Sequence, residues 1–78
     1  MNEDFVPEPM RKHSVTIQGH RTSVSLEPAF WSAIQRLAVD SGTSVNAFVA
    51  EIDAARPKDV GLASALRQVA FRHCGEVD

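Results

Sequence analysis

One stretch of strict alternation, residues 21–26, constrains the fold of this chain more than any other segment. It reads Arg-Thr-Ser-Val-Ser-Leu, and directly after it Glu27-Pro28 begins a pattern typical of a helix. Successive side chains of a strand point to opposite faces, so Val24 and Leu26 share one face and the polar alternates share the other. These polar positions are Arg21, Ser23 and Ser25. An isolated strand of this length is unstable in water, and the segment must therefore pair with another strand.

A second alternating run, residues 13–18, precedes the first and places Val15 and Ile17 on one face. Gly19 lies between the two runs, and glycine at such a position permits a turn, a bulge or a close approach of the backbone. Two arrangements fit this spacing: a hairpin between the two runs, or one extended segment that is kinked at Gly19. The clean alternation favours ordered structure over a loose arm in both cases.

The periodicity changes to that of a helix at Pro28. The spacing predicts an amphipathic helix over residues 28–41, with Pro28 at the first position, where its missing N–H costs nothing. The apolar stripe consists of Phe30, Ile34, Leu37 and Ala38, with Trp31 one step round the helix. Gly42 is expected to end this helix in the left-handed conformation.

Two further helices are predicted by the same periodicity. The first covers residues 44–56, with Ser44 as its N-cap, and Pro57 ends it because a residue before proline is disfavoured in the α region. Its apolar positions are Val45, Phe48, Val49, Ile52 and Ala55. After a short connection, an alanine-rich helix is predicted over residues 62–73. The chain is thus expected to be mainly α-helical with a short N-terminal β-ribbon.

The length of 78 residues allows a single domain. We expect a flexible acidic arm over residues 1–10, the folded domain over residues 11–73 and a tail over residues 74–78. A monomer of this size buries a modest fraction of its surface. Self-association is therefore the expected additional source of stability.

Several classes of protein are not expected from the sequence. No segment resembles a signal peptide or a membrane span, which indicates a soluble, cytoplasmic protein. Cys74 is the only cysteine, so it forms no intrachain disulfide, and no Cys/His spacing typical of zinc sites is present. No nucleophile–base pair, phosphate-binding glycine loop or pair of catalytic carboxylates is evident. We therefore expect no enzymatic activity, no cofactor and no metal.

The charge is distributed unevenly along the chain. The formal net charge of −2 argues weakly against a nucleic-acid partner. However, Arg11, Lys12 and Arg21 lie in a segment without acids, between Glu8 and Glu27. Such a basic segment points to nucleic acid only if the fold gathers it onto one face.

The order of strand, helix, glycine turn and helix over residues 21–56 resembles the ribbon-helix-helix superfamily, which includes the Arc, MetJ and CopG repressors. Residues 11–73 are similar, more closely, to small bacterial ribbon-helix-helix-domain proteins. The shared segments are Ser-Val-Thr-Ile at 14–17, Gly-His-Arg-Thr-Ser at 19–23, Phe-Trp at 30–31 and Ala-Glu-Ile-Asp-Ala-Ala-Arg at 50–56. The run 13–18 and the helix 62–73 are additions to the minimal fold.

The resemblance implies an intertwined homodimer, in which the strands of two copies pair antiparallel across a two-fold axis. Val24 and Leu26 would then lie on an apolar floor built by both chains. The residues expected in this floor are Phe30, Ile34, Leu37, Phe48, Val49 and Ile52, with Trp31 as a core or interface anchor. Folding and dimerisation would be a single event that depends on protomer concentration.

The resemblance also implies that the ribbon lies in the major groove of double-stranded DNA. The groove-facing positions of the family fall on Arg21, Ser23 and Ser25, whose side chains match the hydrogen-bonding groups of base edges. Backbone N–H groups at the start of the second helix would clamp a phosphate, because a helix N-terminus offers unpaired donors and positive dipole. These donors belong to Ser44, Val45 and Asn46. Arg11 and Lys12 are expected to reach flanking phosphates.

An alternative function is a protein-binding module, such as an antitoxin. In that case residues 57–78 would bind a partner protein, and DNA binding would be an additional property or absent.

Overall fold

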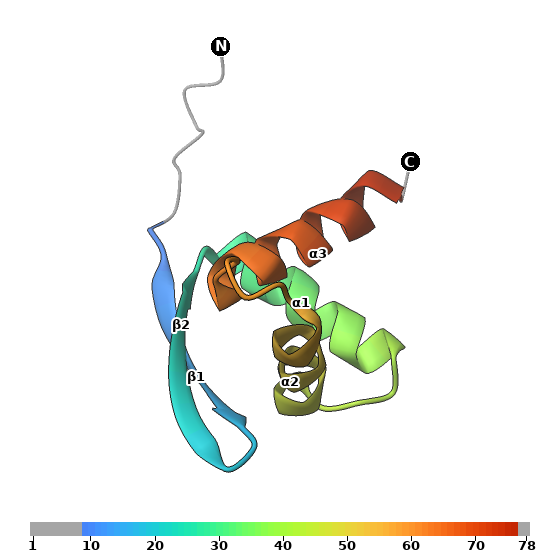
Figure 1. Cartoon of the computed structure of the whole chain (residues 1–78). Coiled ribbons are helices and arrows are strands. Elements are labelled where there is room, and N and C mark those ends of the chain that lie inside the picture. Colours follow the sequence, from blue (N-terminus) through green and yellow to red (C-terminus); the bar gives the residue numbers. More distant parts are fainter. Residues whose placement is uncertain (1–8, 77–78) are drawn as a thin grey trace.

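The computed structural model describes residues 9–76 and contains a two-stranded antiparallel sheet followed by three helices. The elements are β1 (Arg11–Ile17), β2 (His20–Leu26), α1 (Pro28–Asp40), α2 (Val45–Ala55) and α3 (Leu62–Glu76). All three helices lie on one side of the hairpin (Figure 1). Most of the acidic arm predicted for residues 1–10, and the end of the tail predicted for 74–78, fall outside the described residues.

The two alternating runs form a hairpin, which is one of the two arrangements left open by the sequence. Ile17 pairs with His20 next to the turn, and β1 begins at Arg11 rather than at the predicted His13. The connecting residues, Gln18 and Gly19, have φ angles of 52° and 81°. A two-residue turn with both residues at positive φ matches the twist of the strands that it joins. Each strand therefore has a pairing partner within one chain.

The helix ends follow from local chemistry. α1 ends in a Schellman motif, in which Thr43 N–H donates to Ala38 O and Gly42 N–H donates to Val39 O, both at 3.0 Å. Gly42 has a φ of 72°, as its predicted left-handed role requires. At the start of α2, Ser44 Oγ accepts a hydrogen bond from Ala47 N–H at 3.1 Å, which confirms Ser44 as the N-cap.

The end of α2 is fixed by Pro57 and by the side chain of Arg56. Arg56, before the proline, has left the helical region, with φ −71° and ψ 146°. Its Nε donates to Asp53 Oδ1 at 2.8 Å, and its Nη1 donates to Val60 O at 2.6 Å. The arginine thereby ties the connection between α2 and α3 back to α2.

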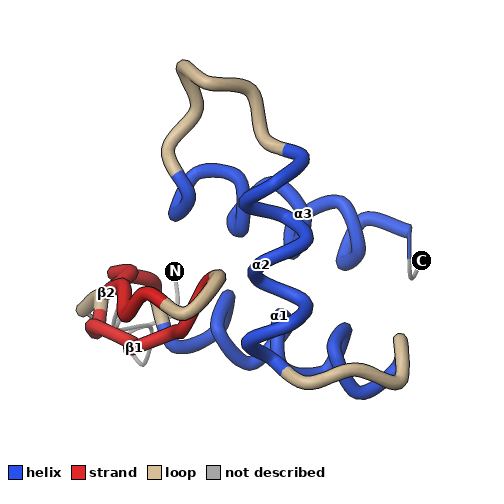
Figure 2. Tube along the Cα trace, turned by 60° about the horizontal axis from the view of Figure 1, so that its bottom comes forward, coloured by secondary structure: helices blue, strands red, loops and turns tan. Residues whose placement is uncertain are grey.

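The core lies where the inner side of the hairpin meets the three helices. α2 passes in front of α1 and α3, with the hairpin beside it (Figure 2). α3 contributes two fully buried residues, Leu66 and Ala70, so this helix belongs to the core of the single chain. The buried cluster consists of Val15, Val24, Leu26, Ile34, Val49, Leu66 and Ala70. Burial of each larger side chain stabilises the fold by about 1.5–3 kcal/mol.

The residues predicted to form the shared apolar floor divide into two groups. Val24, Leu26, Ile34 and Val49 are buried within one chain. Five others pack against this core and are only partly buried: Phe30, Trp31, Leu37, Phe48 and Ile52. One chain therefore leaves large apolar side chains incompletely covered.

Candidate nucleic-acid interface

The outer face of the hairpin, which points away from the helices, is entirely polar. Its members form three cross-strand pairs, Lys12 with Ser25, Ser14 with Ser23 and Thr16 with Arg21. Five of the six are exposed and Ser25 is half-buried. This face holds two cations and four hydroxyls and no carboxylate, so it presents positive charge and hydrogen-bonding groups together.

The three groove-facing residues that the resemblance implied, Arg21, Ser23 and Ser25, therefore lie on one face. Lys12 shares the face with them. Arg11 does not, because it pairs with Leu26 and alternates with Lys12. Ser14 and Thr16 also belong to the face. These two residues were not predicted, although the alternation of residues 13–18 contained the signal.

The two edges of the hairpin differ in their hydrogen bonding. Thr16 N–H donates to Asn46 Oδ1 at 3.3 Å, on the side of β1 away from β2. Thr16 and its partner Arg21 therefore form a pair that exchanges no backbone hydrogen bonds, and such pairs alternate along an antiparallel ladder. It follows that the N–H groups of Arg21, Ser23 and Ser25 point away from β1. No acceptor for them lies within residues 9–76.

The start of α2 lies beside β1, as the hydrogen bond from Thr16 to Asn46 shows. Ser44 caps the helix through Ala47 N–H, so the N–H groups of Val45 and Asn46 remain near the helix end without intrahelical acceptors. These donors are close to β1, on the side of the hairpin opposite the open edge of β2. The structure thus places Ser44, Val45 and Asn46 next to the basic ribbon.

A comparison with known families decides the identity of this arrangement. The model of a ribbon-helix-helix domain matches residues 10–74. The chain belongs to the ribbon-helix-helix family. Members of this family are DNA-binding domains that typically lack enzymatic activity. No curated protein and no solved structure shows a significant match.

The inner face of the ribbon carries a histidine, His13, beside the aliphatic residues Val15 and Val24. The ring of His13 stacks on Trp31 with centroids 4.1 Å apart and an interplanar angle of 9°. The Nε2 atom of His13 is buried and has no hydrogen-bond partner within the described part of the chain. This contact was not predicted, although strand alternation places His13 on the same face as Val15.

One ion pair ties the strand–helix junction to α3. Arg67 Nε donates to Glu27 Oε1 at 2.9 Å, and Arg67 Nη2 lies 2.9 Å from Met10 Sδ. Hydrogen bonds from the Glu27 backbone N–H and from Arg67 lower the pKa of the Glu27 carboxyl below its ordinary value. The pair spans forty residues of sequence and carries no periodic signal, so it was not predicted.

The acidic character of the chain is concentrated at its ends. All eight Lys and Arg residues fall within residues 9–76, whereas only six of the ten Asp and Glu residues do. This folded part of the chain therefore carries a formal charge of +2, although the whole chain carries −2. The net charge is compatible with an anionic partner for the domain itself.

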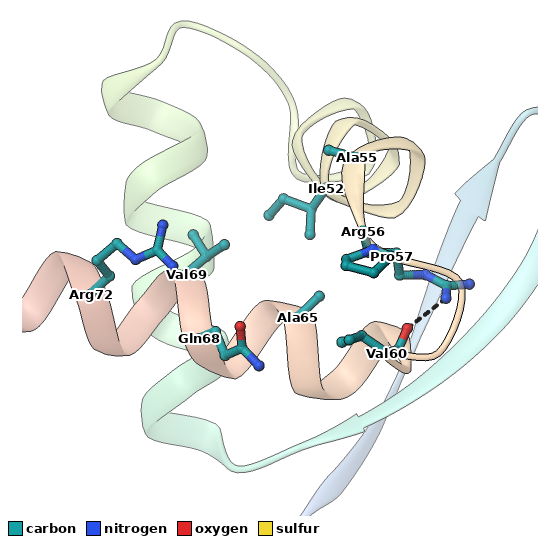
Figure 3. Close-up of a pocket in the computed structure, with 9 residues that line it drawn as sticks. All are labelled: Ile52, Ala55, Arg56, Pro57, Val60, Ala65, Gln68, Val69 and Arg72. Carbon is teal, nitrogen blue, oxygen red and sulfur yellow. Dashed lines mark hydrogen bonds between the residues drawn. The ribbon is translucent and has the colours of Figure 1, made fainter.

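A second feature is an apolar groove of about 180 Å³ between the end of α2, the following connection and α3. The side chains of Ile52, Ala65 and Val69 point into it, and Arg56 and Arg72 lie along its rim (Figure 3). Its other lining residues are Ala55, Pro57, Val60 and Gln68. Six of its nine lining residues belong to the segment 57–78, which the antitoxin alternative assigned to a protein partner.

Neither a metal centre nor a membrane span is found among residues 9–76. Among the side chains that the structure describes, no three of His, Cys, Asp or Glu gather closely enough to hold a metal ion. None of the helices there combines the length and apolar character needed to cross a membrane.

Proposed function

We propose that this protein is a homodimeric transcriptional regulator, of the repressor type, that places its β-ribbon in the major groove of DNA. The observation that carries the proposal is the outer face of the hairpin. Lys12 and Arg21 lie there among four hydroxyl side chains, with no carboxylate to repel phosphate. The membership of a DNA-binding family supports the same conclusion.

Two observations support the homodimer. The N–H groups of Arg21, Ser23 and Ser25 form an open edge on β2, and an open edge is a template for another strand. In addition, five large apolar side chains are only partly buried in one chain, and a second copy would cover them. These residues are Phe30, Trp31, Leu37, Phe48 and Ile52.

The DNA contacts follow from side-chain chemistry. Arg21 can donate two hydrogen bonds to guanine O6 and N7, and each good bidentate pair contributes about 1–3 kcal/mol of discrimination. Ser23 and Ser25 can donate to or accept from several base edges. The N–H groups of Val45 and Asn46 at the start of α2 would bind a phosphate oxygen.

Binding to a randomised pool of DNA duplexes at low salt tests the proposal. We expect the wild type to select a sequence from the pool, and Arg21→Ala, which removes two arginines from each dimer, to bind the selected duplex at least about 30-fold more weakly. The control is Arg72→Ala, which removes an exposed cation from the α2–α3 groove and should leave affinity unchanged. Absence of DNA affinity in the wild type, or equal effects of the two changes, would refute the proposal.

The groove between α2 and α3 supports the antitoxin-like module as a second candidate function. The buried side chains of Leu66 and Ala70 argue against a free C-terminal segment, because removing α3 would expose the core. Hydrogen exchange tests which form of the module is possible. If α3 shows protection comparable to that of α1, a protein partner can bind only the formed groove, whereas rapid exchange would mean that the segment is free to fold on a partner.

A further inference from the structure

We infer that β1 is a phosphate-binding strand: in the DNA complex it lies over the sugar–phosphate backbone at the rim of the major groove, while β2 reads the bases. The inference rests on the proposed function and deepens it. It assigns Lys12, Ser14 and Thr16 to the DNA backbone and leaves Arg21 and its neighbours to the base edges.

The first step is the order of the strands. β1 already pairs with β2 on one side, and α2 lies against its other edge near the turn, where Asn46 accepts the Thr16 N–H. The N–H groups of Arg21, Ser23 and Ser25 all lack an acceptor within the described residues, so β2 offers the longer open edge and a second copy pairs through it. The dimer then contains a four-stranded sheet in which the two β2 strands are central and the two β1 strands are outermost.

The register of the central pair follows from the direction of the N–H groups. Residues 21, 23 and 25 all point their N–H groups to the open edge, so they must oppose one another in the dimer. Pairing that uses all three places Ser23 opposite the second copy's Ser23 and Arg21 opposite its Ser25. Lys12 and Thr16 then lie at opposite ends of each outer strand.

The second step is the width of this sheet. Neighbouring strands lie about 4.8 Å apart, so the two β1 strands are separated by three spacings, about 14 Å. The major groove is about 12 Å wide and admits a two-stranded ribbon. The central β2 pair therefore fits in the groove, and the β1 strands are left above its two walls, which are the phosphate backbones.

The chemistry of β1 suits this position. Lys12 supplies a point charge, and the hydroxyls of Ser14 and Thr16 are donors to phosphate oxygens. All three are exposed on the outer face. The start of α2 lies next to the edge of β1 that faces away from β2, at the Thr16–Asn46 hydrogen bond. Side chains of β1 and backbone donors of α2 thus converge on one rim of the groove.

The salt dependence of binding tests this assignment. Because each dimer carries two copies, Lys12→Ala should reduce the slope of log affinity against log salt by about 2. It should weaken binding by the same factor on the selected duplex and on unrelated duplexes, so that sequence preference is unchanged. Thr16→Val should also weaken both equally, with no change in slope. Lys58→Ala, in the exposed α2–α3 connection, is the matched control and should alter neither quantity.

A cross-linking experiment tests the strand order independently. In a Cys74→Ser background, Ser23→Cys should be joined between copies by a bismaleimide shorter than two strand spacings, whereas Ser14→Cys should not. The opposite pattern, or equal cross-linking, would overturn the four-stranded order.

The failure of this inference differs from the failure of the proposed function. If the wild type binds no DNA, the proposed function is wrong. If the wild type binds and Arg21→Ala impairs it, but Lys12→Ala leaves the salt slope unchanged or alters the selected sequence, β1 does not lie on the backbone. A single hairpin that enters the groove alone would produce that altered sequence preference.

Discussion

The two faces of the hairpin come from the same alternation and have opposite roles. On the inner face Val15, Val24 and Leu26 are between 0% and 4% exposed, and the fold depends on them. On the outer face every side chain is polar, and five of the six are exposed. Folding therefore constrains only one half of each strand, and the other half is available for recognition of a ligand.

The largest expected loss of stability comes from a substitution on the inner face of the hairpin. Leu26→Ala removes a fully buried side chain from the point where β2 enters α1, and we expect it to lower the free energy of unfolding by about 2–5 kcal/mol. Ser25→Ala, on the adjacent outer position, should change it by less than about 0.5 kcal/mol. Urea unfolding followed by circular dichroism measures both. Similar losses for the two variants would contradict the division into faces.

A smaller loss of stability is expected from a substitution in the turn between β1 and β2. Gly19→Ala places a Cβ at a φ of 81° and should destabilise the protein by about 1–2 kcal/mol. Gly61→Ala is a matched control, since that glycine has no positive φ and no atom would meet its Cβ within 4 Å. Thermal unfolding of the two variants gives the comparison. Equal melting temperatures would mean that the turn does not require the left-handed conformation.

The smallest expected change in stability comes from Glu27, at the junction between β2 and α1, and it depends on pH. The folded state lowers the pKa of the Glu27 carboxyl, so the contribution of its hydrogen bonds is present at neutral pH. This contribution is lost as the pH falls through the lowered pKa, where the carboxylate is protonated in the folded state. Glu27→Gln should therefore flatten the acid side of the stability profile, and Arg67→Ala should flatten it in part. A profile unchanged by Glu27→Gln would contradict the assignment.

The sequence predicted most features that depend on local chemistry. The N-cap at Ser44, the left-handed Gly42 and the end of α2 before Pro57 each follow from the preferences of one or two neighbouring residues. The inward and outward positions of β2 follow from alternation alone. These features are readable because their cause lies within a few residues of their effect.

Contacts between distant segments were not predicted, because periodicity contains no information about them. The ion pair from Arg67 to Glu27, the hydrogen bond from Thr16 to Asn46 and the stacking of His13 on Trp31 each join different elements. The pairing of β1 with β2 could not be predicted from periodicity for the same reason. Gly19 permitted a turn, but the sequence did not decide between a turn and a kink.

The central claim is that the outer face of the hairpin binds DNA, and amide chemical-shift mapping tests it most directly. On titration of the labelled protein with the selected duplex, we expect the largest changes at Lys12, Ser14, Thr16, Arg21, Ser23 and Ser25. Amides at the start of α2 should also shift, and those that line the α2–α3 groove should not. Changes confined to the groove, with the hairpin amides unmoved, would contradict the claim.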